Sequence, residues 1–139
     1  MNKSEYYQEK TITNWQGSSY SHVKLIEIRS VDDIKYSLSY AKELGLSIAV
    51  KGGGCSYSDV FLNNDGIVLD LINFIKILSF DKANLIIEVE SGARLDRLLD
   101  LLLPQGFTLP IVPGVRFPSV GGLLAVSYTH LTLPTKRIV

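Results

Sequence analysis

The sequence predicts an α+β fold, and three observations lead to this class. A strand, a helix and a second strand follow one another over residues 23–50, which indicates parallel strands joined by a helix. A hairpin pattern follows over residues 77–90, and a leucine-rich helix follows the hairpin. At 139 residues, with 46% hydrophobic and 20% charged residues, the chain has the size and composition of one ordinary globular domain.

The first 20 residues are polar with scattered aromatic side chains. Residues 14–19 predict a loop, and we expect Trp15 to be its buried packing anchor rather than a ligand contact. Residues 23–28, Val-Lys-Leu-Ile-Glu-Ile, predict the first strand.

A helix is predicted to begin after Ser30, because Ser30 and Asp33 resemble a capping box. Gly45 stands where a left-handed residue would end this helix. Apolar residues recur at helical spacing and predict one buried face, formed by Val31, Ile34, Leu38, Ala41 and Leu44. The β-branched run at residues 46–50 then predicts a buried strand.

Three consecutive glycines follow that strand, within Lys-Gly-Gly-Gly-Cys-Ser-Tyr-Ser-Asp at residues 51–59, the glycine loop. Glycine tolerates positive φ and lets the backbone approach a ligand. Successive exposed N–H groups form a site for anions such as a diphosphate, and the hydroxyls of residues 56–58 could bond the same oxygens. A flexible surface turn is the alternative that a glycine triplet alone leaves open.

Later elements continue the alternation of strands and helices. A turn at residues 63–66 leads to a strand at 67–71, and the hairpin strands at 77–80 and 85–90 flank a turn at 81–84. A helix follows Gly92, and its leucine stripe is expected to face the core: Leu95, Leu98, Leu99, Leu102 and Leu103.

Pro104-Gln-Gly106 ends this helix, and three further prolines predict an extended segment at residues 107–118. The sequence Ser-Val-Gly-Gly at 119–122 then enters a short apolar stretch, which makes it a second anion-binding candidate at a helix start. Two glycine loops, each at the end of a regular element, favour a nucleotide ligand over two unrelated turns.

In this order the motifs resemble the N-terminal half of the FAD-binding domain of the vanillyl-alcohol oxidase and p-cresol methylhydroxylase (PCMH) type. The motifs that carry the resemblance are Gly52-Gly-Gly-Cys-Ser-Tyr-Ser-Asp59, Gly66-Ile-Val-Leu-Asp70, Ser91-Gly-Ala-Arg-Leu95, Leu103-Pro-Gln-Gly-Phe107, Leu109-Pro-Ile-Val-Pro-Gly114 and Ser119-Val-Gly-Gly-Leu-Leu-Ala125. The resemblance covers residues 14–125, and within the family it is greatest to decaprenylphosphoryl-ribose oxidases and sugar-1,4-lactone oxidases.

The resemblance implies two α+β subdomains with FAD between them, of which this chain holds the first, βαβ-containing one and the start of the second. The glycines precede Ser-Tyr-Ser-Asp and a turn rather than a helix, which differs from a Rossmann fingerprint. The resemblance implies that FAD contacts Lys51, Gly52, Gly53, Gly54, Cys55, Ser56, Tyr57, Ser58, Asp59, Gly114, Ser119, Val120, Gly121 and Gly122. Tyr57 would lie toward the flavin.

Cys55 departs from the pattern of covalent family members, which carry a histidine here and attach it to the flavin. We expect FAD to be bound non-covalently, with Cys55 as a small, partly buried neighbour. A thioether between Cys55 and the flavin is the alternative, since backbone N–H groups can lower the pKa of a thiol.

The resemblance ends at Ala125. Residues 126–135 look like the translation of a transposon-end sequencing adapter, so we expect residues 126–139 to be a non-native tail and residues 1–125 to be a partial domain. In that case His130 is no site candidate, and without Lys136 and Arg137 the acidic residues are in slight excess.

Composition argues against several other classes of function. The formal net charge is zero, so no basic surface indicates nucleic acid, and two histidines and one cysteine have no metal-ligand spacing. No apolar run approaches the ~18 residues expected of a membrane span. A polar N-terminus and a single cysteine predict a cytoplasmic protein, and membrane association of a longer parent protein stays open.

No catalytic base is evident in residues 1–125, and the resemblance implies that the substrate-side groups come from a C-terminal domain. We therefore expect the N-terminal part of an FAD-dependent oxidoreductase whose small-molecule substrate is a sugar, a sugar lactone or a related hydroxy compound, oxidised at its CH–OH group. We expect this part to be inactive by itself. Two alternatives remain open: a non-catalytic nucleotide-binding module and a degenerate structural remnant.

Overall fold

The structure is a computed structural model, and it describes residues 6–110 and 112–125. The chain divides into two compact units, Met1–Asn73 and Phe74–Val139. Each unit combines strands with at least one helix, which confirms the predicted α+β class.

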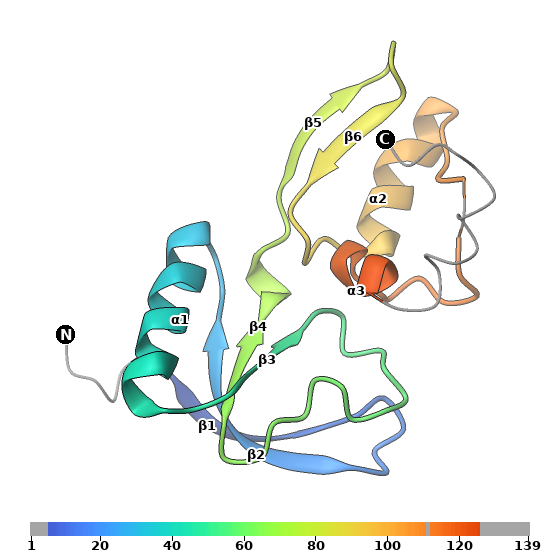
Figure 1. The fold of residues 1–139 in the computed structure, drawn as a ribbon. Helices are drawn as coiled ribbons and strands as arrows, with labels where there is room; N and C mark the ends of the chain where they lie inside the picture. The colour runs from blue at the N-terminus through green and yellow to red at the C-terminus, as the bar shows by residue number, and fades with distance from the viewer. Residues whose placement is uncertain (1–5, 111, 126–139) are drawn as a thin grey trace. The chain divides into compact units, whose positions relative to one another are not determined.

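The first unit contains a four-stranded sheet in the order β1-β2-β4-β3 (Figure 1). β1 (Gln8–Thr13) runs antiparallel to β2 (Tyr20–Glu27), whereas β2 and β3 (Ile48–Lys51) both pair in parallel with β4 (Ile67–Asp70). The predicted strand-helix-strand unit is therefore confirmed as parallel, with β4 inserted between its two strands. All four residues of β4 are buried because β4 has neighbours on both sides.

The prediction of a buried strand at residues 46–50 is wrong in its degree of burial. β3 is the edge strand of the sheet, and Val50 is 54% exposed. β1 was not predicted at all, because five of its six side chains are exposed and the segment carries no alternating pattern. Val23, Leu25 and Val68 form a core cluster on one face of the sheet, with Ile12 of β1 packed against it.

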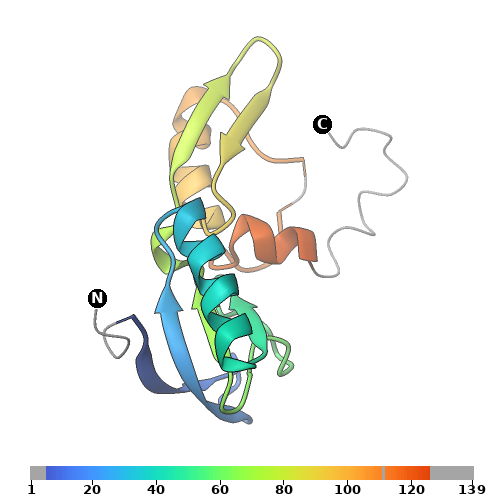
Figure 2. The ribbon, with the colours of Figure 1, turned by 60° about the vertical axis from the view of Figure 1, so that its left-hand side comes forward.

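α1 (Val31–Leu44) lies along the sheet of the first unit (Figure 1 and Figure 2). Its predicted ends are confirmed: the Ser30 hydroxyl accepts a hydrogen bond from the Asp33 N–H, and Gly45 has a φ of 65°. The Asp33 carboxylate in turn accepts from the Arg29 N–H.

The predicted buried face of α1 is confirmed at Ala41 and wrong at three of its five residues. Val31, Leu38 and Leu44 are 54%, 53% and 43% exposed, whereas Ser37, Tyr40 and Ala41 are buried. The contact face is thus rotated by one position from the apolar stripe. Ser37 satisfies its hydroxyl by donating to the Asp33 carbonyl of the preceding turn, so a polar side chain can occupy the interface.

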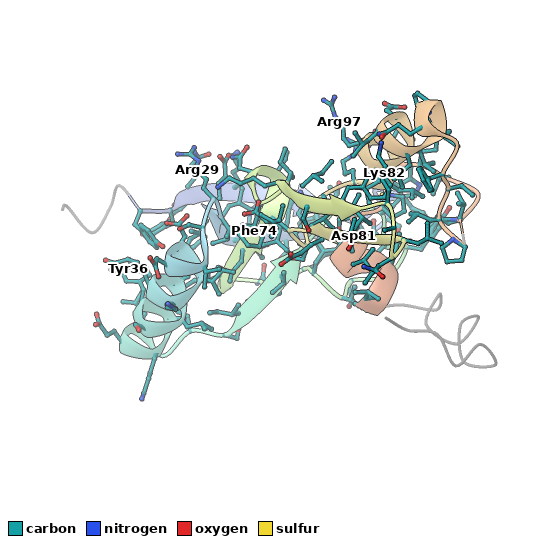
Figure 3. All side chains as sticks on the ribbon, turned by 90° about the horizontal axis from the view of Figure 1, so that it is seen from above. Arg29, Tyr36, Phe74, Asp81, Lys82 and Arg97 are labelled. Atoms are coloured by element: carbon teal, nitrogen blue, oxygen red, sulfur yellow. The ribbon has the colours of Figure 1, made fainter. Side chains whose placement is uncertain are left out.

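The second unit contains a hairpin of β5 (Ile77–Asp81) and β6 (Ile86–Val89), which confirms the predicted pairing. Asp81, labelled in Figure 3, closes the turn by accepting from the Ala83 and Asn84 N–H groups and from the Asn84 side chain. These bonds favour the ionised carboxylate, and the hydrogen bond from the Asn84 side chain is the main cause of the lowered pKa of Asp81.

α2 (Leu95–Leu102) follows the hairpin, and a 3₁₀ turn, η3 (Leu103–Gln105), ends at Gly106 with a φ of 80°. Four of the five predicted stripe residues are buried: Leu95, Leu98, Leu99 and Leu102. Leu103 is 55% exposed and does not belong to the stripe, because the helix has tightened into the 3₁₀ turn at that position. Residues 107–110 and 112–118 belong to no helix or strand and contain bends at Pro110, Gly114 and Arg116. The predicted helix start after residue 119 is confirmed by α3 (Val120–Ala125).

The expected non-native tail at residues 126–139, with His130, lies outside the described residues. Among the residues that are described, no helix is long and apolar enough to cross a membrane. No group of three or more His, Cys, Asp or Glu side chains within 6–110 and 112–125 is placed to hold a metal ion.

Candidate functional site

The glycine loop begins where β3 ends, at the carboxyl edge of the parallel strands. Gly54 has a φ of 69°, in the left-handed region, and a Cβ built there would lie 3.4 Å from the Lys51 Cε atom. The N–H groups of Gly52 and Gly54 have no acceptor among the described residues. Backbone donors of a glycine-rich turn that are not bonded within the fold suit an acceptor-rich anion.

Lys51 is held at the start of the loop by Asp70. Its Nζ atom lies 2.9 Å from the Asp70 Oδ2 atom, and the two side chains are only 21% and 8% exposed. The strand register explains the contact, because Lys51 and Asp70 are Cα partners in the β3–β4 ladder. The other Asp70 oxygen accepts from the Ile72 N–H, so the carboxylate is satisfied on both sides.

Asn14 fixes the far half of the glycine loop. Its side chain is buried, donates to the Tyr57 carbonyl at 2.8 Å and accepts from the N–H groups of Ser18 and Ser19. The neighbouring Trp15 N–H donates to the Ser56 carbonyl at 2.9 Å. Residues 14–19 therefore brace residues 56 and 57.

The prediction that Trp15 is the buried anchor of that N-terminal loop is wrong. Trp15 is 45% exposed, and Asn14, at 4%, is the buried residue. The sequence signal that could have identified Asn14 is its position two residues before Gln-Gly-Ser-Ser, since Asn side chains commonly bond the backbone of such turns.

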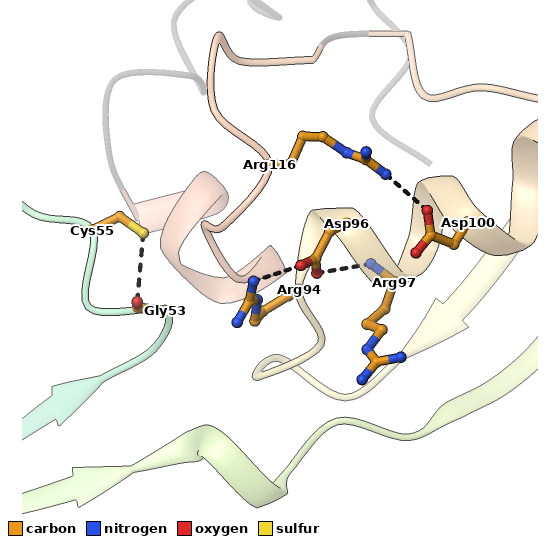
Figure 4. A network of polar contacts seen from close by, with 7 residues as sticks. All are labelled: Gly53, Cys55, Arg94, Asp96, Arg97, Asp100 and Arg116. Atoms are coloured by element: carbon orange, nitrogen blue, oxygen red, sulfur yellow. Dashed lines mark hydrogen bonds and ion pairs between the residues drawn. The ribbon is translucent and has the colours of Figure 1, made fainter.

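The remaining side chains of the glycine loop differ in exposure. The Cys55 thiol is half-buried and donates to the Gly53 carbonyl at 3.4 Å (Figure 4). The hydroxyls of Ser56 and Ser58 lie 3.1 Å apart and bond each other, while Tyr57 is 63% exposed. The Asp59 carbonyl accepts from the Leu62 N–H and closes the loop.

The second glycine segment, residues 119–122, belongs to the second unit. Ser119 is fully buried, and its hydroxyl accepts from the Gly122 N–H at 3.2 Å. The Val120 N–H donates to the Ala93 carbonyl, and the Gly121 N–H donates to the Ser91 carbonyl. The N···O distance is 2.8 Å in both bonds.

Close packing explains why position 121 is a glycine. A Cβ at Gly121 would lie 3.1 Å from the Ser91 carbonyl oxygen, whereas one at Gly114 would meet nothing within 4 Å. The close approach at Gly121 keeps the backbone of the second glycine segment against the start of α2.

These features fit a dinucleotide with a diphosphate. A diphosphate accepts hydrogen bonds and cannot donate them at neutral pH, and the glycine loop offers backbone donors that lack an acceptor among the described residues. The predicted site residues form one continuous segment in the first unit, residues 51–59. In the second unit they are residues 119–122 and Gly114.

Comparisons with known proteins identify the family. A family model described as "FAD binding domain" matches residues 24–130. Decaprenylphosphoryl-beta-D-ribose oxidase of Mycolicibacterium smegmatis is 36% identical over 84 residues, covering 60% of this chain and 18% of the relative. The mitochondrial L-galactono-1,4-lactone dehydrogenase of Arabidopsis thaliana is 26% identical over 117 residues, covering 84% of this chain and 19% of the relative. The chain thus spans about a fifth of these relatives.

Solved structures show the same fold. Cholesterol oxidase from Brevibacterium sterolicum matches with a TM-score of 0.75 at 15% identity, over 86% of this chain and 24% of that one. Alkyldihydroxyacetonephosphate synthase matches with a TM-score of 0.71 at 16% identity, over 88% and 27% of the two chains. Together with the family match and the glycine loop, these findings show that the chain belongs to the family of FAD-binding domains and that FAD is its cofactor.

Proposed function

We propose that this chain is the cofactor-binding part of an FAD-dependent oxidoreductase that oxidises the CH–OH group of a sugar, a sugar lactone or a related hydroxy compound. The names of the similar proteins support this substrate class, since they refer to a ribose, to L-galactono- and D-arabinono-1,4-lactones and to D-lactate. Bound FAD would supply the chemistry by accepting the electron pair from the substrate.

The observation that carries the proposal is the arrangement of the glycine loop. The N–H groups of Gly52 and Gly54 have no acceptor within the described residues, and Gly54 adopts a φ of 69°. We assign the diphosphate of FAD to residues 51–59, with backbone donors making the main contacts. Lys51 would add positive charge while it stays paired with Asp70.

Within the second unit we propose FAD contacts at Gly114 and at residues 119–122. A buried Ser119 and a Gly121 that cannot accept a Cβ without displacing Ser91 support a role that depends on backbone shape. Tyr57, which is largely exposed, is proposed to lie toward the flavin ring.

We propose that the described residues bind and orient FAD and do not supply the catalytic base. The base would then lie in a substrate domain outside residues 1–125, and the present chain would bind FAD without turnover. We also propose that residues 126–139 are a non-native tail. Resequencing the parent DNA past codon 125 checks that assignment.

FAD titration followed by an anaerobic reduction assay tests the function. We expect the purified protein to quench the fluorescence of added FAD and to retain a flavin spectrum after desalting. We expect a sugar lactone or a 2-hydroxy acid to bleach the flavin only when the chain is extended by a substrate domain. Flavin that no hydroxy compound bleaches in the extended protein would favour a non-catalytic binding module. An absence of flavin from the extended protein would contradict the proposed cofactor site.

A further inference from the structure

The N-terminus of α2 is capped by the chain that leads into the second glycine segment. Arg94, the N-cap residue, makes no side-chain capping bond. Instead, the Leu95 N–H donates to the Pro118 carbonyl at 3.0 Å and the Asp96 N–H donates to the Arg116 carbonyl at 2.9 Å. The first N–H groups of a helix have no acceptor within it, so these carbonyls satisfy donors that would otherwise need water or a side chain.

The same pairing continues into the glycine pair. Arg94 and Ser119 form an antiparallel bridge, and the next N–H groups, those of Val120 and Gly121, bond the chain just before Arg94. The position of residues 119–121 is therefore set by the backbone on either side of Arg94.

The Arg94 side chain adds a side-chain link beside these backbone bonds, between Asp96 and Phe117. Its guanidinium forms an ion pair with the Asp96 carboxylate (Figure 4). Its Cζ atom lies 5.2 Å from the centre of the Phe117 ring. Asp96 is only 24% exposed and also accepts from the Arg97 N–H, which fixes its orientation. Arg94, Asp96 and Phe117 form what we call the Arg94 cluster.

A second link between the same elements is weaker. Arg116 and Asp100 lie 2.8 Å apart, but their side chains are 53% and 66% exposed. Exposed pairs of this kind contribute little, because solvent screens them and two long side chains lose freedom. The Arg94 cluster combines a less exposed ion pair with a cation–π contact and is the stronger of the two links.

We propose that Arg94 is a positioning residue for FAD: it does not contact the cofactor, and it holds the backbone of Ser119, Val120 and Gly121 in the conformation that binds it. The inference rests on the proposed function of the second glycine segment. Asp96 and Phe117 act through Arg94, by holding its guanidinium between the first turn of α2 and the residue two positions before Ser119.

The test compares Arg94→Ala with Arg97→Ala. Arg97 is an exposed arginine within α2 whose side chain has no partner among the described residues, so its substitution removes the same charge and leaves the Arg94 side chain in place. In Arg94→Ala we expect hydrogen exchange at the Val120 and Gly121 amides to become about tenfold faster and the Kd for FAD to rise about fivefold. Arg97→Ala should leave both unchanged, and Arg94→Lys should recover part of each loss because it keeps the charge.

Two further variants separate the inference from the proposed function on which it rests. Phe117→Leu, at a 47% exposed position, keeps apolar bulk and removes the ring face, so it gives the same readouts if Arg94→Ala does not fold. Gly121→Ala forces the backbone away from Ser91 and should weaken FAD binding whatever Arg94 does.

If Gly121→Ala weakens FAD binding while Arg94→Ala matches Arg97→Ala in exchange and in Kd, the positioning role is overturned. If exchange accelerates in Arg94→Ala and FAD binding is unchanged in both variants, the segment does not bind FAD and the proposed site itself is overturned.

Discussion

Lys51 and Asp70 face each other at the carboxyl ends of two adjacent parallel strands, with Nζ and Oδ2 2.9 Å apart. The pair lies at the point where β3 ends and the glycine loop begins. Both side chains are mostly removed from solvent, so their charges are screened less than those of surface pairs. The pair thereby fixes the first residue of the loop to the buried strand β4.

Asp70→Asn should destabilise the chain by about 1–3 kcal/mol, because it leaves the Lys51 ammonium partly buried without its carboxylate. Urea unfolding followed by circular dichroism measures the change. The matched control is Asp32→Asn, which breaks the exposed Lys35–Asp32 pair at 3.1 Å and should change stability by less than about 0.5 kcal/mol. Equal effects of the two substitutions would show that burial of the Lys51–Asp70 pair has no energetic importance.

Asn14→Ala removes the brace on residues 56 and 57. The change deletes the bonds to the Tyr57 carbonyl and from the N–H groups of residues 18 and 19 at a buried position. We expect a loss of about 2–3 kcal/mol and faster hydrogen exchange at the Trp15 amide, which bonds Ser56.

Asn14→Asp separates the two halves of that brace. Aspartate keeps the acceptor for residues 18 and 19 and loses the donor to Tyr57. Exchange at the Trp15 amide should accelerate in both variants. Wild-type exchange in Asn14→Asp would mean that the bond to Tyr57 does not hold the glycine loop.

Leu98→Ala and Leu103→Ala test the corrected stripe of α2. Leu98 is 1% exposed and Leu103 is 55% exposed, although both stand at helical spacing in the sequence. We expect losses of about 2–5 kcal/mol for Leu98→Ala and below about 1 kcal/mol for Leu103→Ala, measured by thermal unfolding. Similar losses of stability in the two variants would show that Leu103 belongs to the core.

Local signals in the sequence were sufficient for most of the elements. Ser30 and Gly45 set the ends of α1 through capping and positive φ, which depend on adjacent residues only. The glycine loop and the hairpin turn at Asp81 are likewise local.

The predictions that were wrong or missing concern features that depend on contacts between residues distant in sequence. The orientation of α1 is decided by which side meets the sheet, so Leu38 is exposed and Ser37 is buried despite their hydropathy. β1 is defined by its pairing with β2 rather than by its own side chains. Asn14 bonds a residue more than 40 positions away, and Arg94 stands at a helix start that is capped by a segment distant in sequence. No local sequence pattern predicts either role.

Cys55 is predicted not to form a bond with the flavin. Acid denaturation of the FAD-loaded protein should release the yellow colour into the supernatant, and Cys55→Ala should bind FAD with an unchanged Kd. The half-buried thiol donates a hydrogen bond within the loop, to the Gly53 carbonyl. Colour that stays with the precipitated wild-type protein, and is lost in Cys55→Ala, would contradict this prediction.

The central claim is that the backbone of the glycine loop holds the FAD diphosphate, and the Kd for FAD of Gly54→Ala tests it most directly. Gly45→Ala is the matched control, because Gly45 has a φ of 65° against 69° for Gly54 and lies at the end of α1. Both substitutions introduce similar backbone strain, of about 1 kcal/mol. We predict that Gly54→Ala weakens FAD binding about tenfold or more while Gly45→Ala leaves the Kd unchanged. Equal Kd values for the wild-type protein and a folded Gly54→Ala variant would contradict the account.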